Sequence, residues 1–258
     1  MSGSDYLSVS VEWDATIVMS MSMRSSESRD HPSHIALGGG TARASVFGFS
    51  DGLVSNVSLI IGFASSGVGT SVVRLAGLAA AVAGAVSMAT GEWVSISAQN
   101  DLVRRELKLE LGELEHNTAA ETAELATIYE SHGMSRTQAK AGAAEVMLNP
   151  KNAVFVHARE EFGLDPSKLP NPLFIGLLSL ISFLAGAMLP VIPWFFGGGD
   201  TARLVSIIIG ICASAVVGAV IGRYAGRHMI VTAARQVGIL LLATSVTYLI
   251  GRLVGVSV

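Results

Sequence analysis

Five long apolar stretches constrain the fold of this chain more than any other feature of its sequence. A helix that crosses a bilayer needs about 20 mostly apolar residues. The stretches that reach this length are 44–64, 73–97, 173–196, 203–222 and 230–251. Only 14% of the residues are charged, against about 25% in soluble domains. The sequence therefore predicts an all-α membrane protein with five transmembrane helices.

A polar insert lies between the second and third apolar stretches and contains 12 of the chain's 20 acidic residues. We expect four segments along the chain. These are a Ser-rich, disordered N-terminal segment over 1–42, transmembrane helices 1 and 2 over 43–97, an acidic helical domain over 98–171, and transmembrane helices 3 to 5 over 172–258. The N-terminal segment lacks the apolar core of a signal peptide, so we expect no cleavage.

The distribution of Lys and Arg predicts the orientation. If the N-terminus is cytoplasmic, 14 of the 17 basic residues lie on the cytoplasmic side, as the positive-inside rule requires. We therefore expect the N-terminus and the insert in the cytoplasm and the C-terminus outside. The compact, Ala/Gly-rich chain fits a bacterial plasma membrane, and its net charge of −3 gives no indication of nucleic-acid binding.

Capping patterns predict that the insert is helical. The start signals are Thr118-Ala-Ala-Glu121, Ser135-Arg-Thr-Gln138 and Asn149-Pro150, and the stop signals are Gly133 and Gly163. Residues 98–117 contain no helix breaker before Gly112, so we expect them to continue the second membrane helix.

Small residues recur at spacings of four in the fourth apolar stretch. They are Gly210, Ser214, Gly218 and Gly222. This period lets helices approach closely, so it predicts a tightly packed bundle or a dimer seam.

Carboxylates recur on single helix faces of the insert. Glu106, Glu110 and Glu113 lie at i, i+4 and i+7, and Glu121 and Glu124 are about one turn apart. Like charges at such spacings repel by a few tenths of a kcal/mol. A helix that accepts this repulsion is suited to hold a cation.

His157 and Glu161 lie at i and i+4 on the last helix of the insert and extend the same ligand set. Oxygen ligands suit divalent ions such as Fe²⁺ or Mn²⁺, and an added imidazole favours transition metals over Ca²⁺ or Mg²⁺. A plain solvated acidic surface is the alternative interpretation, and Glu121 also fits a capping box.

One carboxylate lies inside the first apolar stretch. Asp51 follows Arg43 by eight residues, which places it about 12 Å deeper along a helix. A carboxylate there costs roughly 3 kcal/mol on insertion scales, so it is typical of an ion path, a proton relay or a packing contact. Ser55 and Ser58 continue a polar stripe from Asp51, and Asn56 lies about 140° away around the helix.

Met88 and Glu92 share a face of the second stretch. A thioether beside carboxylates suits a soft or borderline divalent ion better than Mg²⁺.

Three motifs resemble the vacuolar iron transporter family. They are Phe49-Ser-Asp-Gly-Leu-Val-Ser-Asn56, Gly91-Glu-Trp-Val-Ser-Ile-Ser97 and Glu160-Glu-Phe-Gly-Leu164. The resemblance covers residues 43–258, with five spans and the insert in matching order. It implies a homodimeric exporter of cytosolic Fe²⁺, often also of Mn²⁺, driven by proton exchange. In a eukaryote it implies the vacuolar membrane.

The resemblance also implies roles for single residues. Asp51 and Met88 match an ion path at the dimer interface, and with their neighbours they give the expected path Asp51, Ser55, Asn56, Met88 and Glu92. The metal-capturing glutamates are matched by Glu110, Glu113, Glu121, Glu124 and Glu161. Where relatives have two methionines, this chain has His157-Ala158, so its metal preference stays open between iron and manganese.

Two other functions compete with transport. A membrane-anchored ferritin-type oxidase needs two Glu-x-x-His motifs, and in the region expected to be ordered only Glu113 and His116 have that spacing, so we expect no enzyme. A metal sensor or buffer without transport is the other alternative, although it would have no need of Asp51. We expect metal ions, protons, lipid and a second copy of the chain as partners, and no prosthetic group.

Overall fold

The computed structural model describes residues 40–163 and 165–255. These residues form helices joined by short turns, and the described ranges contain no strand, which confirms the all-α class. The N-terminal segment that we expect to be disordered lies outside the described residues except for its last three positions, which already belong to the first helix.

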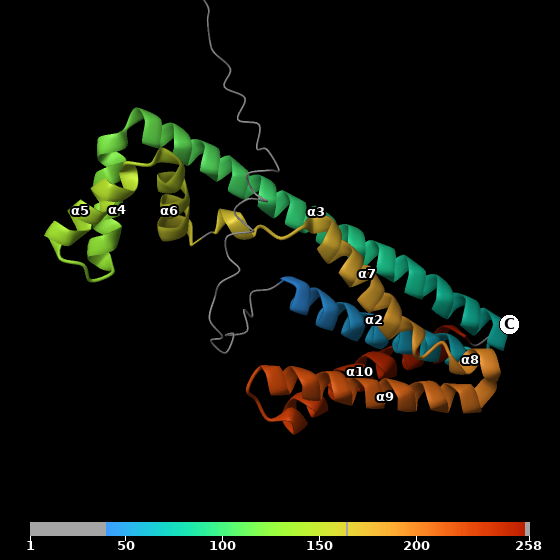
Figure 1. Ribbon diagram of the computed structural model, residues 1–258. Helices are drawn as coiled ribbons and strands as arrows, with labels where there is room; N and C mark the ends of the chain where they lie inside the picture. Colours follow the sequence, from blue (N-terminus) through green and yellow to red (C-terminus); the bar gives the residue numbers. More distant parts are fainter. Residues whose placement is uncertain (1–39, 164, 256–258) are drawn as a thin grey trace, which may run out of the picture.

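The membrane bundle is built from six helices of the described chain (Figure 1). They are α2 (Gly40–Ser65), α3 (Thr70–His116), α7 (Pro172–Met188), α8 (Pro193–Phe196), α9 (Gly199–Tyr224) and α10 (Met229–Val254). Within the described residues, α2, α3, α9 and α10 are long and apolar enough to cross a membrane, whereas α7 is a shorter apolar helix.

The expectation of one unbroken helix over 173–196 is wrong. The chain leaves the helix after Met188, makes a turn, and starts the four-residue helix α8 at Pro193. Proline lacks the backbone N–H and its ring clashes with the preceding turn of a helix, so Pro190 and Pro193 explain the break. α7 itself is about 26 Å long, at the lower end of what a bilayer requires.

α7 lies in the groove between α2 and α3 and packs most extensively against α2 (Figure 1). A Cβ atom added at Gly52 would meet the carbonyl oxygen of Phe183, and one added at Gly186 would meet that of Phe49. The two backbones therefore touch reciprocally at these glycines.

α9 and α10 pair with each other, and α10 also packs along α2. The small-residue stripe of α9 is buried, and a Cβ atom at Gly218 would come within 2.6 Å of the Thr232 carbonyl oxygen on α10. The predicted close packing at this stripe is confirmed. At Gly218 the two helices in contact, α9 and α10, belong to the same chain.

α3 runs without interruption from the bundle into the insert, as predicted, and its far end carries three shorter helices (Figure 1). These are α4 (Thr118–Ser131), α5 (Arg136–Met147) and α6 (Pro150–Phe162), and the 3₁₀ helix η1 (Pro166–Lys168) leads back to α7. Leu114 on α3 packs with Ala153 and Val154 on α6, so the insert has an apolar core of its own.

The predicted helix boundaries are confirmed at most positions. The side chains of Ser135 and Asn149 accept hydrogen bonds from the backbone N–H groups three residues later, and Gly163 ends α6 in the left-handed conformation. The capping box at Thr118 is wrong, because α4 already begins at this residue and its hydroxyl donates to the Leu114 carbonyl. Glu121 therefore has no capping role.

The reciprocal glycine contact gives a first prediction. Gly186→Ala should lower the thermal unfolding midpoint of the detergent-solubilised protein, because overpacking a close helix contact typically costs about 1–3 kcal/mol. Gly238→Ala is the matched control, since a Cβ atom at this exposed position of α10 meets no atom within 4 Å in the described chain. Equal midpoints for the two variants would contradict the close α2–α7 contact.

Candidate metal-binding sites

Three helices of the insert bring five acidic and imidazole side chains together. Two groups have ligand atoms that lie within 4.8 Å of one another: Glu110, His157 and Glu161, and Glu110, Glu113 and Glu121. Glu110 and Glu113 come from α3, Glu121 from α4, and His157 and Glu161 from α6. Glu110 belongs to both groups and is the centre of the cluster.

The side chain of His157 is fully buried beside Glu110 in this cluster. Its Nδ1 atom lies 3.0 Å from Glu110 Oε1 and 3.8 Å from Glu121 Oε2. The short contact lacks hydrogen-bond geometry, and neither ring nitrogen nor Glu110 Oε1 has a hydrogen-bond partner in the described part of the chain. Each buried polar atom without a hydrogen-bond partner costs about 1–3 kcal/mol, so these atoms do not stabilise the insert, and their lone pairs are not used within the described chain.

Burial and charge set the protonation of the cluster. Burial first, and then the charges of Glu161, Glu121, Glu113 and Glu124, together raise the pKa of Glu110 from 4.5 to about 7. Burial also raises the pKa values of Glu121 and Glu161, with Glu124 as the largest neighbouring charge.

Burial lowers the pKa of His157 more than the Glu124 charge raises it. The imidazole is therefore neutral at neutral pH and keeps a lone pair for a metal ion.

Two predicted insert ligands lie outside the two groups. Glu106 is half-buried one turn before Glu110 on α3. Glu124 is exposed on α4 and acts on the cluster through its charge.

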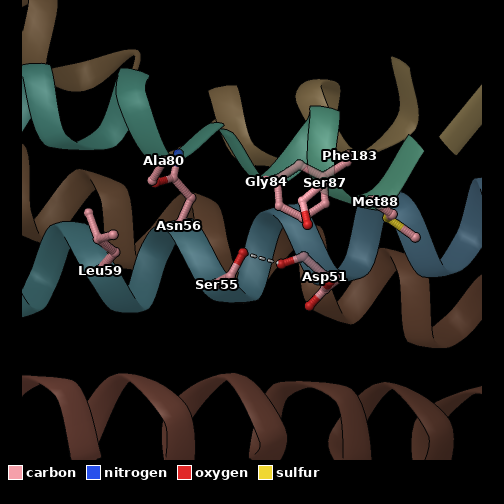
Figure 2. Close-up of a pocket in the computed structure, with 9 residues that line it drawn as sticks. All are labelled: Asp51, Ser55, Asn56, Leu59, Ala80, Gly84, Ser87, Met88 and Phe183. Carbon is pink, nitrogen blue, oxygen red and sulfur yellow. Dashed lines mark hydrogen bonds between the residues drawn. The ribbon is translucent and has the colours of Figure 1, made fainter. Parts of the chain in front are cut away.

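A second candidate site is a hollow of about 370 Å³ between α2, α3 and α7 (Figure 2). Its lining residues are Asp51, Ser55, Asn56, Leu59, Ala80, Gly84, Ser87, Met88 and Phe183. We call it the α2–α3 hollow. Asp51 is exposed, whereas Met88 is half-buried and packs against the cluster around Phe183.

Asn56 fixes the wall of this hollow. Its amide nitrogen donates to the carbonyl oxygens of Gly77 on α3, at 3.2 Å, and Ala187 on α7, at 2.6 Å. Its buried Oδ1 atom has no hydrogen-bond partner in the described residues. The amide therefore ties three helices together and keeps one oxygen free.

The other predicted path residues lie in different surroundings. The Ser55 hydroxyl lines the hollow and donates to the Asp51 backbone carbonyl at 2.6 Å (Figure 2). Ser58, which belongs to the predicted polar stripe but not to the expected path, has its hydroxyl 3.4 Å from the Thr244 hydroxyl of α10. Glu92 is not among the lining residues and pairs instead with the Arg43 guanidinium, at 3.3 Å.

Sequence reasoning missed five of the lining residues: Leu59, Ala80, Gly84, Ser87 and Phe183. Ser87 directly precedes Met88, but adjacent residues of a helix point about 100° apart, so this position did not assign Ser87 to the hollow. Phe183 comes from α7, which reaches the hollow through tertiary packing alone, and its ring fills the space above Gly84 (Figure 2).

One straight element joins the two candidate sites. Met88 and Glu110 are 22 residues apart on α3, which corresponds to about 33 Å along the helix. The oxygen, nitrogen and thioether ligands at its two ends suit borderline divalent ions.

Known proteins resemble this chain over most of its length. The "Vacuolar iron transporter" of Acanthamoeba castellanii is 35% identical over 203 residues, which cover 76% of this chain and 72% of that protein. The "Vacuolar iron transporter 1" of Oryza sativa subsp. japonica is 27% identical over 219 residues, with coverage of 84% and 87%. The "Vacuolar iron transporter" of Toxoplasma gondii is 30% identical over 200 residues, with coverage of 72% and 65%.

A family model described as the VIT family matches residues 42–252, which include both candidate sites and nearly all of the described chain. This protein therefore belongs to the VIT family.

Proposed function

We propose that this chain transports divalent metal ions, Fe²⁺ and also Mn²⁺, out of the cytoplasm. The observation that carries the proposal is the α2–α3 hollow, in which a carboxylate and a thioether face the same space inside apolar helices. Asp51 and Met88 supply a hard and a soft ligand, a pair that suits Fe²⁺ better than Mg²⁺. The relatives named iron transporters support iron as the transported ion.

Asn56 completes the proposed ligand set of the hollow. Its amide nitrogen is committed to α3 and α7, so Oδ1 is the atom that remains for an ion. A neutral oxygen lining the same hollow as Asp51 adds a ligand without adding charge.

The proposed assembly is a homodimer with five spans per copy. In this arrangement α7 and α8 together form the third span. Asp51 is exposed in the single chain, and a carboxylate facing lipid is costly. Val82 and Val86 on the neighbouring α3 are also exposed and apolar, so a second copy that covers this face would shield the carboxylate from lipid.

The insert, over residues 98–171, is proposed to be cytoplasmic and to collect the ion before transport. The buried cluster around Glu110 and His157 supports metal capture, because its unpaired atoms gain ligand bonds when an ion binds. α3 then holds this cluster at a fixed distance from the α2–α3 hollow.

Proton exchange is proposed at Asp51. A carboxylate that releases a metal ion in an apolar setting binds a proton instead, since an isolated charge there is unfavourable. Export would then be driven by protons moving inward, across a bacterial plasma membrane or, in a eukaryote, the vacuolar membrane. Glu92 is bound to Arg43 and is not needed for this step.

Metal flux tests the transport proposal. Asp51→Ala should reduce Fe²⁺ or Mn²⁺ flux into proteoliposomes by at least about tenfold, because the path then lacks its charged ligand. Flux is read from a metal-quenched dye inside the vesicles while the pH gradient is varied.

Asp200→Ala is the matched control for this flux test, since Asp200 is an exposed carboxylate paired with Arg203 at the start of α9. Full flux in Asp51→Ala would contradict the path. Absence of flux in the unaltered protein, with metal still bound, would favour a sensor or buffer.

The pKa of Glu110 gives a prediction for stability. The unfolded chain releases this proton near pH 4.5 and the folded chain near pH 7. Between these values the unfolded state binds fewer protons, so the metal-free insert should lose stability as pH rises from 4.5 to 7, by up to roughly 3 kcal/mol. Hydrogen exchange of peptides from α4 and α6 at pH 5 and pH 8 measures this loss.

Mn²⁺ should restore protection at pH 8, because a bound ion stabilises the ionised cluster. Glu110→Gln should reduce both the pH dependence and the Mn²⁺ effect, with Glu121 and Glu161 left to titrate, while Glu115→Gln, an exposed position on the same helix, should change neither. Protection that increases with pH in the metal-free protein would contradict the burial of Glu110.

A further inference from the structure

His157 differs in its contacts from His132, the other histidine in the region of α4 to α6. His132 is more than half exposed and its Nδ1 lies 3.4 Å from the Glu160 carboxylate, an ordinary surface pair. His157 is fully buried, and neither of its nitrogens has a hydrogen-bond partner in the part of the chain that the structure describes. A histidine used only for packing would be expected to satisfy at least one nitrogen.

We propose that His157 makes the insert a nitrogen–oxygen site that prefers later first-row ions, with Co²⁺, Zn²⁺ and Fe²⁺ bound more tightly than Mn²⁺, and Mn²⁺ more tightly than Ca²⁺ or Mg²⁺. The inference rests on the proposed capture of metal by the insert and adds the residue that determines selectivity.

The distances around His157 suit a single ion. Ligand atoms that each lie about 2.1 Å from an ion are about 3.0 Å apart when adjacent in an octahedron and at most about 4.2 Å apart. Nδ1 of His157 lies 3.0 Å from Glu110 Oε1 and 3.8 Å from Glu121 Oε2. Both separations fall within this range, so these atoms need no large movement to share an ion.

The order of preference follows from ligand chemistry. Affinity of a mixed site rises along the first row from Mn²⁺ through Fe²⁺ and Co²⁺, and imidazole suits these later ions, whereas Mg²⁺ and Ca²⁺ prefer oxygen alone. Ca²⁺ also requires six to eight oxygens at about 2.3–2.6 Å.

The neighbouring residue Ala158 is buried and its side chain has no atom that can bind a metal ion. Of these two neighbours, only His157 can therefore affect which ion the site prefers.

Metal competition on the full-length protein in detergent tests the selectivity. His157→Leu should lower the ratio of Co²⁺ affinity to Mn²⁺ affinity by about tenfold or more, because the nitrogen ligand is lost. His132→Leu is the matched control and should keep the ratio. Leucine removes a buried, unpaired ring, so the metal-free variant should unfold at no lower temperature than the unaltered protein.

Pulsed electron paramagnetic resonance gives a direct test that needs no stable variant. The unaltered protein with less than one Mn²⁺ per chain should show coupling to an imidazole ¹⁴N nucleus. The coupling should persist in His132→Leu and vanish in His157→Leu.

Three outcomes decide the matter. Nitrogen coupling and a lowered ratio in His157→Leu support the inference. Bound Mn²⁺ without nitrogen coupling, or an unchanged ratio, overturns it and leaves metal capture by the insert intact. A protein that binds no metal once Asp51 and Met88 are both replaced by Ala overturns metal capture itself, and with it this inference, while the flux experiment judges transport separately.

Discussion

An unbroken ladder of backbone hydrogen bonds along α3 is the constraint on which the rest of the structure depends. The helix runs for 47 residues, packs against α7 in its first half and supports α4 and α6 at its far end. Its apolar first half and Glu-rich second half need opposite surroundings, yet no residue between Thr70 and His116 breaks the helix. One element therefore fixes the distance and rotation between the α2–α3 hollow and the acidic cluster.

The two candidate sites share a physical feature that ordinary packing does not explain. Each contains buried polar atoms without hydrogen-bond partners in the described chain, Asn56 Oδ1 in the hollow and the Glu110 and His157 atoms in the insert. Elsewhere in the bundle the picture is mixed: Trp194 donates to Ser206 and Ser206 to the Pro190 carbonyl, whereas the hydroxyls of Ser179 and Ser214 are buried without a partner in the described chain. Four of these six unsatisfied atoms of the described chain lie at the two candidate sites.

Local chemistry made much of the fold predictable. Hydropathy identified α2, α3, α9 and α10, and the caps at Ser135 and Asn149 marked α5 and α6. Hydropathy averages ignore proline, so the break after α7 was missed. The Thr118 box failed because α3 extends to His116, which leaves Asn117 as the N-cap of α4 and puts Thr118 inside the helix.

The candidate sites were predictable only in part. Asp51 was recognisable because it is a lone carboxylate in an apolar stretch. The hydrogen bond from the Asn56 amide to the Ala187 carbonyl joins residues 131 apart in the sequence. A contact at that sequence separation leaves no local sequence pattern. For the same reason Phe183 could not be assigned to the hollow from sequence. The roles of these residues in transport, and the coupling to protons, stay predictions.

The lining of the α2–α3 hollow has a consequence for charge balance. Among the residues of the described chain that line the hollow, Asp51 is the one that can ionise. Glu92 lies outside the hollow, and its charge is balanced by Arg43. A single carboxylate leaves a divalent ion with one uncompensated positive charge, which a medium of low dielectric constant strongly disfavours. Two symmetry-related hollows facing each other would bring two carboxylates to one ion and make the loaded site electrically neutral.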